Sequence, residues 1–268
     1  MNHRTLRSAR LSAIVCALGL AFAANNAAAQ SSEVASAAVK ACAVSGSVTV
    51  TVLGINTTLP LPCAGQAQVT AAGNDDKSAL GIDLSLLGLV NVVKLDTVHQ
   101  RADYNNLTGA TALDGFSEVA GVSLVQNLVT AQGLRGSLSC DSLSGDSRLQ
   151  CQATSTVADV RIAGGNVITL PTPIPRNFTV PVGGRLRLVV LGLPVEVPVG
   201  GALVLNQAAA SGAGTNHVTV THQAAQLGLG GSVSVGGLGL IAVRVEASAS
   251  PSTITVNSTR PVSAVTID

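Results

Sequence analysis

Apolar and polar residues alternate with a period of two along most of the 268-residue chain. Valine, leucine and isoleucine occupy every second position of several segments, with serine, threonine or arginine between them. The clearest segments are 47–53 (SVTVTVL), 185–191 (RLRLVVL), 216–222 (NHVTVTH), 231–237 (GSVSVGG), 241–250 (IAVRVEASAS) and 252–256 (STITV). Because the side chains of a strand point alternately to its two faces, this pattern predicts half-buried antiparallel strands separated by Gly, Asn and Pro turns.

Two segments favour a helix instead, the alanine-rich 33–41 (EVASAAVKA) and the shorter 123–129 (SLVQNLV). Hydrophobic residues make up 47% of the chain and aromatic residues only 1%, so the core must be aliphatic. We therefore predict an all-β fold: an antiparallel β-sandwich-like domain with short helical pieces and two disulfides.

The first 29 residues have the pattern of a secretory signal peptide. Three arginines without any acidic residue precede an apolar run at 11–22, and cleavage is expected between Ala29 and Gln30. The apolar run is shorter than the roughly 20 residues that span a bilayer, so no transmembrane segment is expected in the mature chain. We expect export to the extracellular space, the cell surface or the periplasm.

Residues 30–268 are expected to form a single secreted all-β domain, in which 30–80 could be a separate N-terminal hairpin segment. One weak internal repeat relates 52–60 (VLGINTTLP) to 190–198 (VLGLPVEVP), as if one strand–turn–strand device were used twice. Chance similarity within a chain rich in Leu, Gly and Val is an equally good explanation.

The segment 140–151 (CDSLSGDSRLQC) holds two of the four cysteines outside the leader. A two-residue turn at Gly145 and Asp146 would place Cys140 directly opposite Cys151, with Leu138 opposite Ala153 on the same face. A calcium loop lacks its alternating ligands here, and a zinc site lacks any C-x-x-C pair. We therefore predict a disulfide that staples a hairpin.

Cys42 and Cys63 follow as the second pair by elimination, although four cysteines permit three connectivities. A turn at 54–55 would leave these two cysteines out of register, so a bulge or a wider loop is required. Disulfides of this kind indicate an oxidising compartment.

The charge balance argues against two classes of partner. Of the 15 basic and 14 acidic residues, the leader holds three arginines and no acid, which leaves 12 and 14. The mature net charge of about −2 provides no basic surface for nucleic acid or for an anionic membrane.

Catalytic motifs are scarce. His99 with Asp96 and Asp103 is the best local acid/base cluster, but no G-x-S-x-G elbow accompanies it. His217 and His222 are five residues apart on an expected strand, which points them to opposite faces as surface or edge residues. We expect no catalytic residue, no metal site and no cofactor. The alternative is a secreted hydrolase or carbohydrate-active protein that uses the His99 and Asp103 region.

The segments 122–140 (VSLVQNLVTAQGLRGSLSC), 162–184 (IAGGNVITLPTPIPRNFTVPVGG), 202–207 (ALVLNQ) and 215–222 (TNHVTVTH) resemble the choice-of-anchor P family of bacterial secreted proteins. The resemblance covers roughly residues 80–256. It implies a β-rich, exported, often surface-associated protein without an assigned enzymatic activity, and it transfers no catalytic residues. We accordingly expect a secreted or cell-surface structural or interaction protein, adhesin-like, whose partners are cell-envelope or extracellular proteins or polysaccharides.

Overall fold

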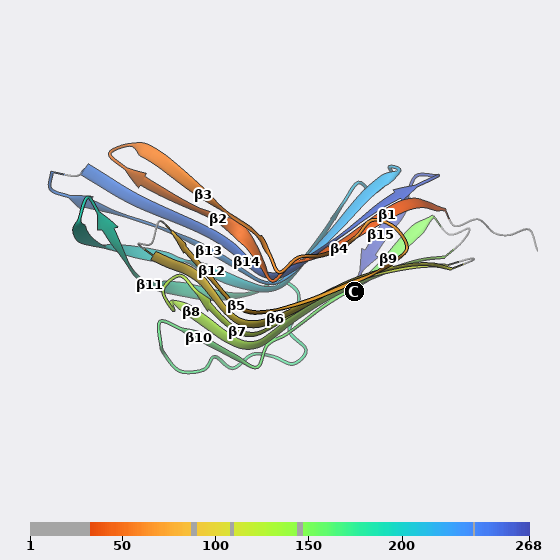
Figure 1. The fold of residues 1–268 in the computed structure, drawn as a ribbon, viewed down its shortest axis with the longest axis horizontal. Coiled ribbons are helices and arrows are strands. Elements are labelled where there is room, and N and C mark those ends of the chain that lie inside the picture. The colour runs from red at the N-terminus through yellow and green to blue at the C-terminus, as the bar shows by residue number, and fades with distance from the viewer. Residues whose placement is uncertain (1–32, 87–89, 108–109, 144–146, 238) are drawn as a thin grey trace, which may run out of the picture.

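The computed structural model describes residues 33–86, 90–107, 110–143, 147–237 and 239–268. Its strands form two sheets packed face to face, which confirms the predicted all-β class (Figure 1). The eight strands of sheet A are β1 (Val34–Ala41), β2 (Val44–Val52), β3 (Ile55–Ala64), β4 (Ala67–Val69), β11 (Phe178–Val190), β12 (Leu193–Ser211), β13 (His217–Val235) and β14 (Gly239–Ser258). The seven strands of sheet B are β5 (Gly73–Leu86), β6 (Val90–Leu107), β7 (Ala110–Leu124), β8 (Val129–Leu143), β9 (Arg148–Thr156), β10 (Asp159–Ile162) and β15 (Ala264–Ile267).

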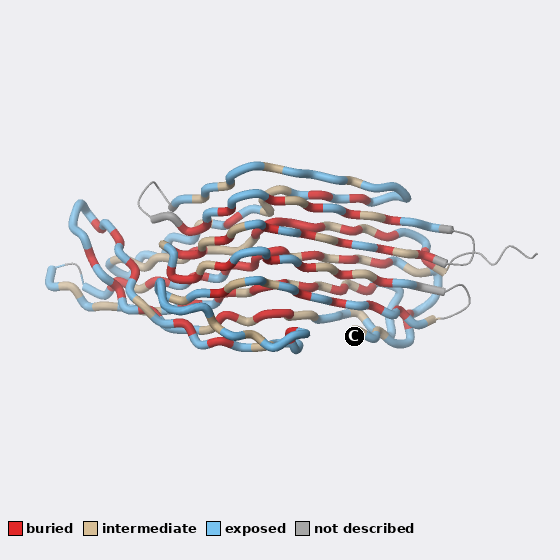
Figure 2. Tube along the Cα trace, turned by 90° about the horizontal axis from the view of Figure 1, so that it is seen from below, coloured by how far each residue is buried: buried red, intermediate tan, exposed pale blue. Residues whose placement is uncertain are grey.

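The strands run antiparallel to their neighbours except at one edge, where β15 runs parallel to β9. Sheet A has the order β11-β12-β13-β14-β1-β4, and the first half of β14 pairs with β2, which pairs with β3. Sheet B has the order β15-β9-β8-β7-β6-β5, with β10 beside the start of β8. Buried and exposed residues alternate along the strands (Figure 2), so each sheet turns an aliphatic face inward.

Both segments that the sequence predicts as helical have other structures, and the described residues contain no helix. Residues 34–41 of the first segment form β1, which lies between β14 and β4. Val39 and Ala41 are fully buried there, so packing between the sheets overrides the helix propensity of alanine. In the second segment, Ser123 and Leu124 end β7, and a left-handed turn follows.

The repeated VLG motif marks two hairpin turns of the same type. Leu53 and Gly54 join β2 to β3 with φ values of 53° and 76°, and Leu191 and Gly192 join β11 to β12 with 51° and 82°. Positive φ at both central residues is the geometry of a type I′ turn, which matches the twist of the flanking strands. The two copies of the motif therefore do use one strand–turn–strand device twice.

The described part of the N-terminal segment belongs to sheet A up to Val69. β1, β2, β3 and β4 all belong to sheet A, and the β2–β3 hairpin continues that sheet along β14 from Ile241 to Ala249. The chain then enters sheet B at Gly73, the start of β5. Residues 34–69 thus contribute to the same two core clusters as the rest of the molecule.

Both predicted disulfides are present. Cys140 on β8 lies directly opposite Cys151 on β9, and Leu138 lies opposite Ala153 as the predicted register requires. The turn at 145–146 lies outside the described residues. Cys42 bonds to Cys63, and the β2–β3 ladder contains the expected register shift close to this bond. The turn of that hairpin falls at 53–54, one residue earlier than the sequence suggests.

Aliphatic side chains fill two separate clusters between the sheets. One cluster lies toward the end where the β2–β3, β11–β12 and β13–β14 hairpins turn, which we call the hairpin end (left in Figure 1). Its largest members include Leu95, Leu134, Leu186, Leu203, Leu227 and Ile241. The other cluster lies toward the opposite, far end, and includes Tyr104, Leu113, Leu138, Ile254 and the Cys140–Cys151 disulfide.

A row of small and polar residues separates the two clusters. On sheet B, Gln100, Ser117, Gly136 and Ser155 are successive cross-strand neighbours on β6, β7, β8 and β9. All but Gly136 are among the buried polar residues of the chain. We call this row, together with the sheet A residues that face it, the waist.

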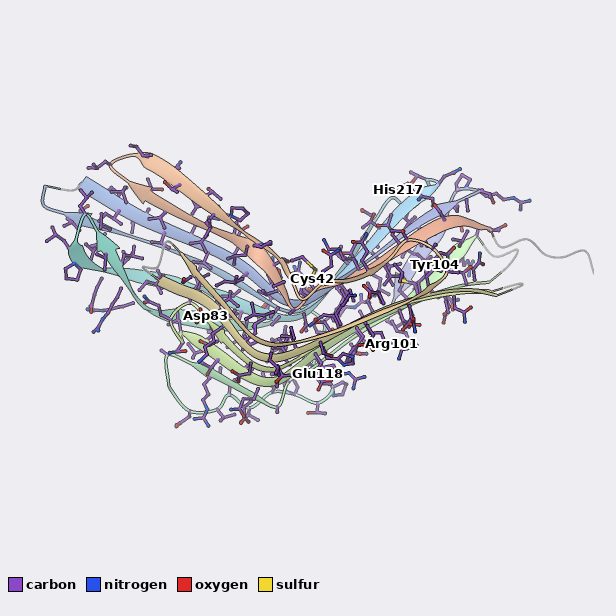
Figure 3. All side chains as sticks on the ribbon, viewed as in Figure 1. Cys42, Asp83, Arg101, Tyr104, Glu118 and His217 are labelled. Carbon is purple, nitrogen blue, oxygen red and sulfur yellow. A yellow bond between two sulfur atoms is a disulfide. The ribbon has the colours of Figure 1, made fainter. Side chains whose placement is uncertain are left out.

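Sheet A changes direction at the waist (Figure 1). Asn206, Ala224 and Ser250 are skipped by the ladders that join β12, β13 and β14, and Asn206 and Ser250 have φ values of 54° and 51°. The backbone amide of Cys42 donates to β14 beside this point (Figure 3). Because the sheet bends here, β14 pairs with β2 before the bend and with β1 after it.

The two sheets approach closely at the waist because the facing residues are small. A β-carbon on Gly136 would lie 2.9 Å from the backbone oxygen of Ser250 and 3.0 Å from the β-carbon of Ala224. On the neighbouring strand, the hydroxyl of Ser117 donates to the backbone oxygen of Cys42 at 2.8 Å. Glycine and serine are therefore needed at these positions, where larger aliphatic side chains would hold the sheets apart.

A buried hydrogen-bond network closes the waist beside β9. His222 on β13 is fully buried, and its Nε2 lies 3.0 Å from Ser155 Oγ and 3.2 Å from Asn206 Oδ1. Asn206 Nδ2 donates to the backbone oxygen of Ile174, which ties in the loop between β10 and β11. Burial, with a smaller effect from the charge of Arg176, lowers the pKa of His222 to about 4. The imidazole is therefore neutral at neutral pH.

Replacing Gly136 with alanine should lower the free energy of unfolding by about 1–3 kcal/mol, because the added methyl group would overlap Ser250 and Ala224. Gly228→Ala on β13 is the matched control, since a β-carbon there meets nothing within 4 Å. Urea denaturation should show a change of less than about 0.5 kcal/mol for the control. Equal stabilities of the two variants would contradict the close approach of the sheets.

The protein should lose stability as the pH falls from 6.5 toward 4, because the unfolded chain protonates His222 near pH 6.5 and the folded chain only near pH 4. In this window the unfolded state binds more protons, so each step down in pH favours unfolding, to a total on the order of 3 kcal/mol. The measurement compares denaturation midpoints across this range for the wild type and His222→Gln. The variant should be less stable overall but should show a shallower decline, and parallel declines would exclude His222 as the responsible group.

Candidate functional site

A polar groove of about 250 Å³ lies on the outer face of sheet B, beside the line along which that sheet bends. Gly81 and Gly133, both with φ of 59°, mark this line on β5 and β8. Two rows of side chains cross the groove from β6 to β10. The first row is Lys94, Ser123, Thr130 and Arg161, and the second is Asp96, Gly121, Gln132 and Asp159.

Charged side chains form the two walls of the groove and uncharged polar ones form its floor. β6 supplies Lys94 and Asp96, and β10 supplies Asp159 and Arg161. Within the part of the chain that the structure describes, none of these four residues takes part in an ion pair. The groove therefore offers two cations and two carboxylates, with no net charge, to whatever enters it.

Gly121 has no side chain, and the Asp96 side chain occupies the space above it on the groove floor. A β-carbon at this glycine would come within 2.1 Å of Asp96 Oδ2. The alternation along β6 is interrupted here, because Asp96 and Thr97 are both exposed and Val98 is buried again. The ladder to β7 skips Asp96 and Thr97 without a change of register. This interruption places the Asp96 carboxylate in the groove beside Gly121.

A strained turn borders the groove between β7 and β8. Val125, Gln126 and Asn127 have φ values of 53°, 56° and 62°, a left-handed conformation that valine in particular rarely adopts. The Gln126 side chain holds the turn, because it donates to the backbone oxygen of Arg187 at 2.8 Å and accepts from its amide at 3.0 Å. Ser123 Oγ donates to Asn127 Oδ1 at 2.6 Å, which fixes Asn127 at the groove edge.

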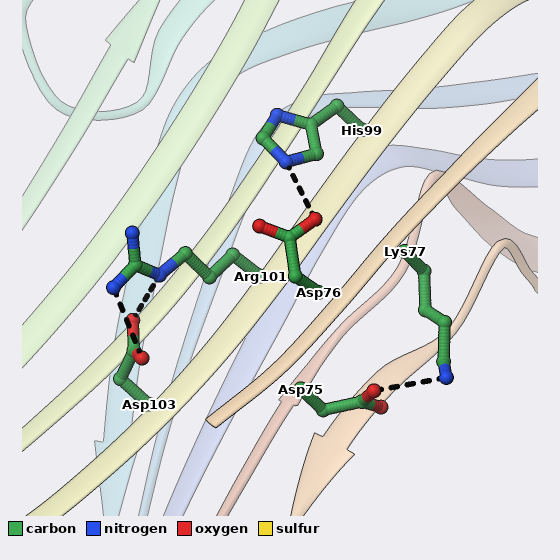
Figure 4. A network of polar contacts seen from close by, with 6 residues as sticks. All are labelled: Asp75, Asp76, Lys77, His99, Arg101 and Asp103. Carbon is green, nitrogen blue, oxygen red and sulfur yellow. Dashed lines mark hydrogen bonds and ion pairs between the residues drawn. The ribbon is translucent and has the colours of Figure 1, made fainter. Parts of the chain in front are cut away.

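The structure separates the three residues of the acid/base cluster that the sequence singled out. Asp96 lines the groove, whereas His99 and Asp103 lie farther along β6, outside the lining. His99 Nε2 lies 2.9 Å from Asp76 Oδ1, and Asp103 accepts two hydrogen bonds from Arg101, at 2.6 and 3.2 Å (Figure 4). Among the described residues, the His99 side chain makes no hydrogen bond to a serine side chain.

The outer face beyond the groove is charged but holds no metal-binding cluster of described residues. Figure 3 shows Arg101 and Glu118 on this face, turned away from sheet A. Phe116 packs edge-on against the His99 ring at 5.5 Å and lies under the Arg135 guanidinium at 4.6 Å. Burial raises the pKa of Asp114, and repulsion from neighbouring carboxylates acts in the same direction.

The buried Ser155, His222 and Asn206 have the composition of a catalytic triad but not its geometry. Both hydrogen bonds of the imidazole involve Nε2, and Nδ1 has no partner among the described residues. All three side chains are buried between the sheets, where no substrate reaches them. His217 is exposed and His222 is buried, so the two histidines lie on opposite faces as the sequence predicts. The prediction that His222 lies at the surface or a sheet edge is wrong.

The sequence did not identify the groove itself. The alternation in VVKLD shows that Lys94 and Asp96 face outward, but it does not reveal which strands lie beside β6. Asp159 and Arg161 enter the site only because β10 pairs with the start of β8. β9 lies between β8 and β10 in the chain, and no local sequence motif indicates that β8 and β10 pair.

The described residues contain no helix of the length and hydropathy that crossing a membrane requires. Comparisons with known proteins identify no relative, since no protein-family model, no curated protein and no solved structure matches this chain.

Proposed function

We propose that this chain is an exported, adhesin-like interaction protein without catalytic activity, which holds a hydroxyl-rich ligand in the groove on sheet B. The ligand class is a polysaccharide segment of the cell envelope or the extracellular matrix. The single observation that carries the proposal is the set of four charged side chains, unpaired among the described residues, that converge on a floor of hydroxyl and amide groups.

The lining matches the hydrogen-bonding capacity of sugar hydroxyls. Lys94 and Arg161 only donate, and Asp96 and Asp159 only accept when ionised, while a sugar hydroxyl can do either. Two neighbouring hydroxyls can meet both oxygens of one carboxylate or two N–H groups of one guanidinium. The walls carry no net charge, which favours an uncharged ligand over an acidic or a basic one.

The lining also supports binding more than chemistry. It contains no histidine and no cysteine, so it offers neither the usual general base nor a thiol nucleophile. It contains no aromatic side chain on which a sugar ring could stack, so one site would bind weakly. Weak single-site binding suits an adhesin that contacts many repeats of a polymer at once.

Three further features support export and a role at the cell envelope. The leader pattern of residues 1–29 is that of a signal peptide, although these residues lie outside the described part of the chain. The two disulfides are typical of oxidising compartments. The resemblance to the choice-of-anchor P family is consistent with a secreted or surface-associated protein.

The alternative of a hydrolase that uses His99 and Asp103 has less support. Each of these residues is already engaged with another side chain, His99 with Asp76 and Asp103 with Arg101. They stand on an exposed strand face and do not line the groove.

The groove is tested by the double variant Asp96→Ala with Arg161→Ala, which removes one acceptor and one donor from opposite walls. Binding to neutral oligosaccharides, selected first by a glycan array and then measured by calorimetry, should weaken about tenfold or more, since a hydrogen bond to a charged group contributes about 1.5–3 kcal/mol.

The matched control is Arg244→Ala with Glu246→Ala, an ion pair on β14 in the other sheet, which leaves the net charge equally unchanged. Its affinity should stay at the wild-type value. Unaltered binding by the groove variant, or equal losses in both variants, would exclude the groove as the binding site.

A further inference from the structure

The exposed large hydrophobic residues gather at the hairpin end of sheet A. Six of the eight such residues in the described chain belong to three hairpins: Leu53 and Ile55 on β2–β3, Val189, Leu191 and Leu193 on β11–β12, and Leu240 on β13–β14. All three hairpins turn at the same end of the molecule (Figure 1). Leu53 and Leu191 are central turn residues, exposed by 58% and 76%. Exposed apolar side chains that are grouped in this way mark a surface that contacts a protein, a ligand or a membrane.

The three hairpins carry no charged residue near their turns. No Asp, Glu, Lys or Arg occurs between Lys40 and Asp75, between Arg187 and Glu196, or between Glu196 and Arg244. At about 3.4 Å per residue, the first charges on β11 and β14 stand roughly 13–17 Å behind the turns. That depth exceeds the roughly 5–10 Å to which peripheral elements enter the boundary between lipid headgroups and acyl chains.

The far end shows the opposite chemistry. The turn between β12 and β13 is GAGTN, residues 212–216, without a large apolar side chain. Glu33 and Arg260 form an ion pair at that end. The leucine turns are therefore a property of one end and not of the hairpins in general.

We infer that the leucine-tipped hairpins β2–β3, β11–β12 and β13–β14 form a lipid-binding end that inserts shallowly into the surface of an uncharged or zwitterionic bilayer. The argument is independent of the groove on sheet B, which lies on the other sheet.

The shape of this end favours lipid over a protein partner. The β12–β13 ladder ends at Gly200 and Gly230, so the β11–β12 tip diverges from the tip of β13–β14. A stable protein interface needs a continuous surface of about 800 Å² on each partner. Acyl chains need no such continuity, because they fill the space between separate tips.

The charge pattern selects the kind of lipid. No basic residue lies among the tips, and the arginines behind them are paired, Arg185 and Arg187 with Glu196 and Arg244 with Glu246. Attraction to anionic lipid headgroups would need a surplus of unpaired cations. Binding should therefore depend on burial of leucine and be insensitive to salt.

The test is flotation of the disulfide-intact protein with phosphatidylcholine vesicles, at low and at high salt. We expect flotation under both conditions. The double variant Leu53→Ser with Leu191→Ser should reduce the bound fraction about tenfold or more, because two inserted side chains lose their apolar burial. The matched control is Leu80→Ser with Val167→Ser, two exposed residues that lie on none of the three hairpins, and it should float like the wild type.

A second measurement does not depend on the serine variants. The chain contains no tryptophan, so a single introduced one reports its own surroundings. The fluorescence of Leu191→Trp should shift to shorter wavelength with vesicles and be quenched by brominated lipid, whereas Leu80→Trp should respond to neither.

Three results would overturn the inference. They are absence of flotation, flotation only with anionic vesicles and lost at high salt, and a dimer in sedimentation that Leu53→Ser with Leu191→Ser abolishes. The last result would show that the hairpin end of one copy covers that of another.

Discussion

The close approach of the two sheets at the waist is the constraint on which the rest of the structure depends. Gly136 meets Ser250 and Ala224 across the interface with no room for a β-carbon, and Ser117 hydrogen-bonds the backbone of Cys42. Because both sheets carry small residues on facing rows, they can touch there and bend away on either side. The left-handed residues Asn206 and Ser250 provide the bend in sheet A.

The bends determine where the two candidate surfaces lie. In sheet B, the interrupted alternation at Asp96 and the left-handed Gly133 lie where β6, β7, β8 and β10 line the groove. In sheet A, the bend directs three hairpins toward one end, where their turns are free of other strands. The Cys42–Cys63 disulfide lies beside the waist. The polar groove on sheet B and the apolar hairpin end of sheet A are both positioned by the bends there.

The parts of this architecture that local chemistry specifies could be predicted from the sequence. The period of two identified β2 and parts of β11, β13 and β14, and the expected turn and alternation around Cys140 and Cys151 gave the register of β8 against β9. The waist could not be predicted, because Gln100, Ser117, Gly136 and Ser155 come together only through four strand pairings. In the sequence, the glutamine and the two serines resemble ordinary outward-facing polar residues, and Gly136 resembles an ordinary strand glycine. His222 was misplaced for the same reason, since its burial depends on Ser155 from the other sheet.

The groove could not be predicted for the same reason, because its residues come from strands that are distant in the sequence. Asp96 was singled out, but with His99 and Asp103, its neighbours in sequence, and not with Arg161 and Asp159, its neighbours across the sheet. The helix expected at 123–129 failed because a Gln126 side chain, bonded to β11, holds the backbone in a left-handed turn. In each case a contact between segments distant in sequence determined the local structure, and the hydrophobic pattern along the chain does not indicate such contacts.

Native-state hydrogen exchange of the backbone amides tests the central role of the waist most directly. If the waist joins the two aliphatic clusters into one cooperative unit, then the Cys42 and Ser250 amides, which bond across the bend, should exchange only by global unfolding. Amides beside both clusters should then show the same opening free energy as these two. Faster exchange at Cys42 and Ser250 than in either cluster would contradict the account, because the halves would then open independently of the waist.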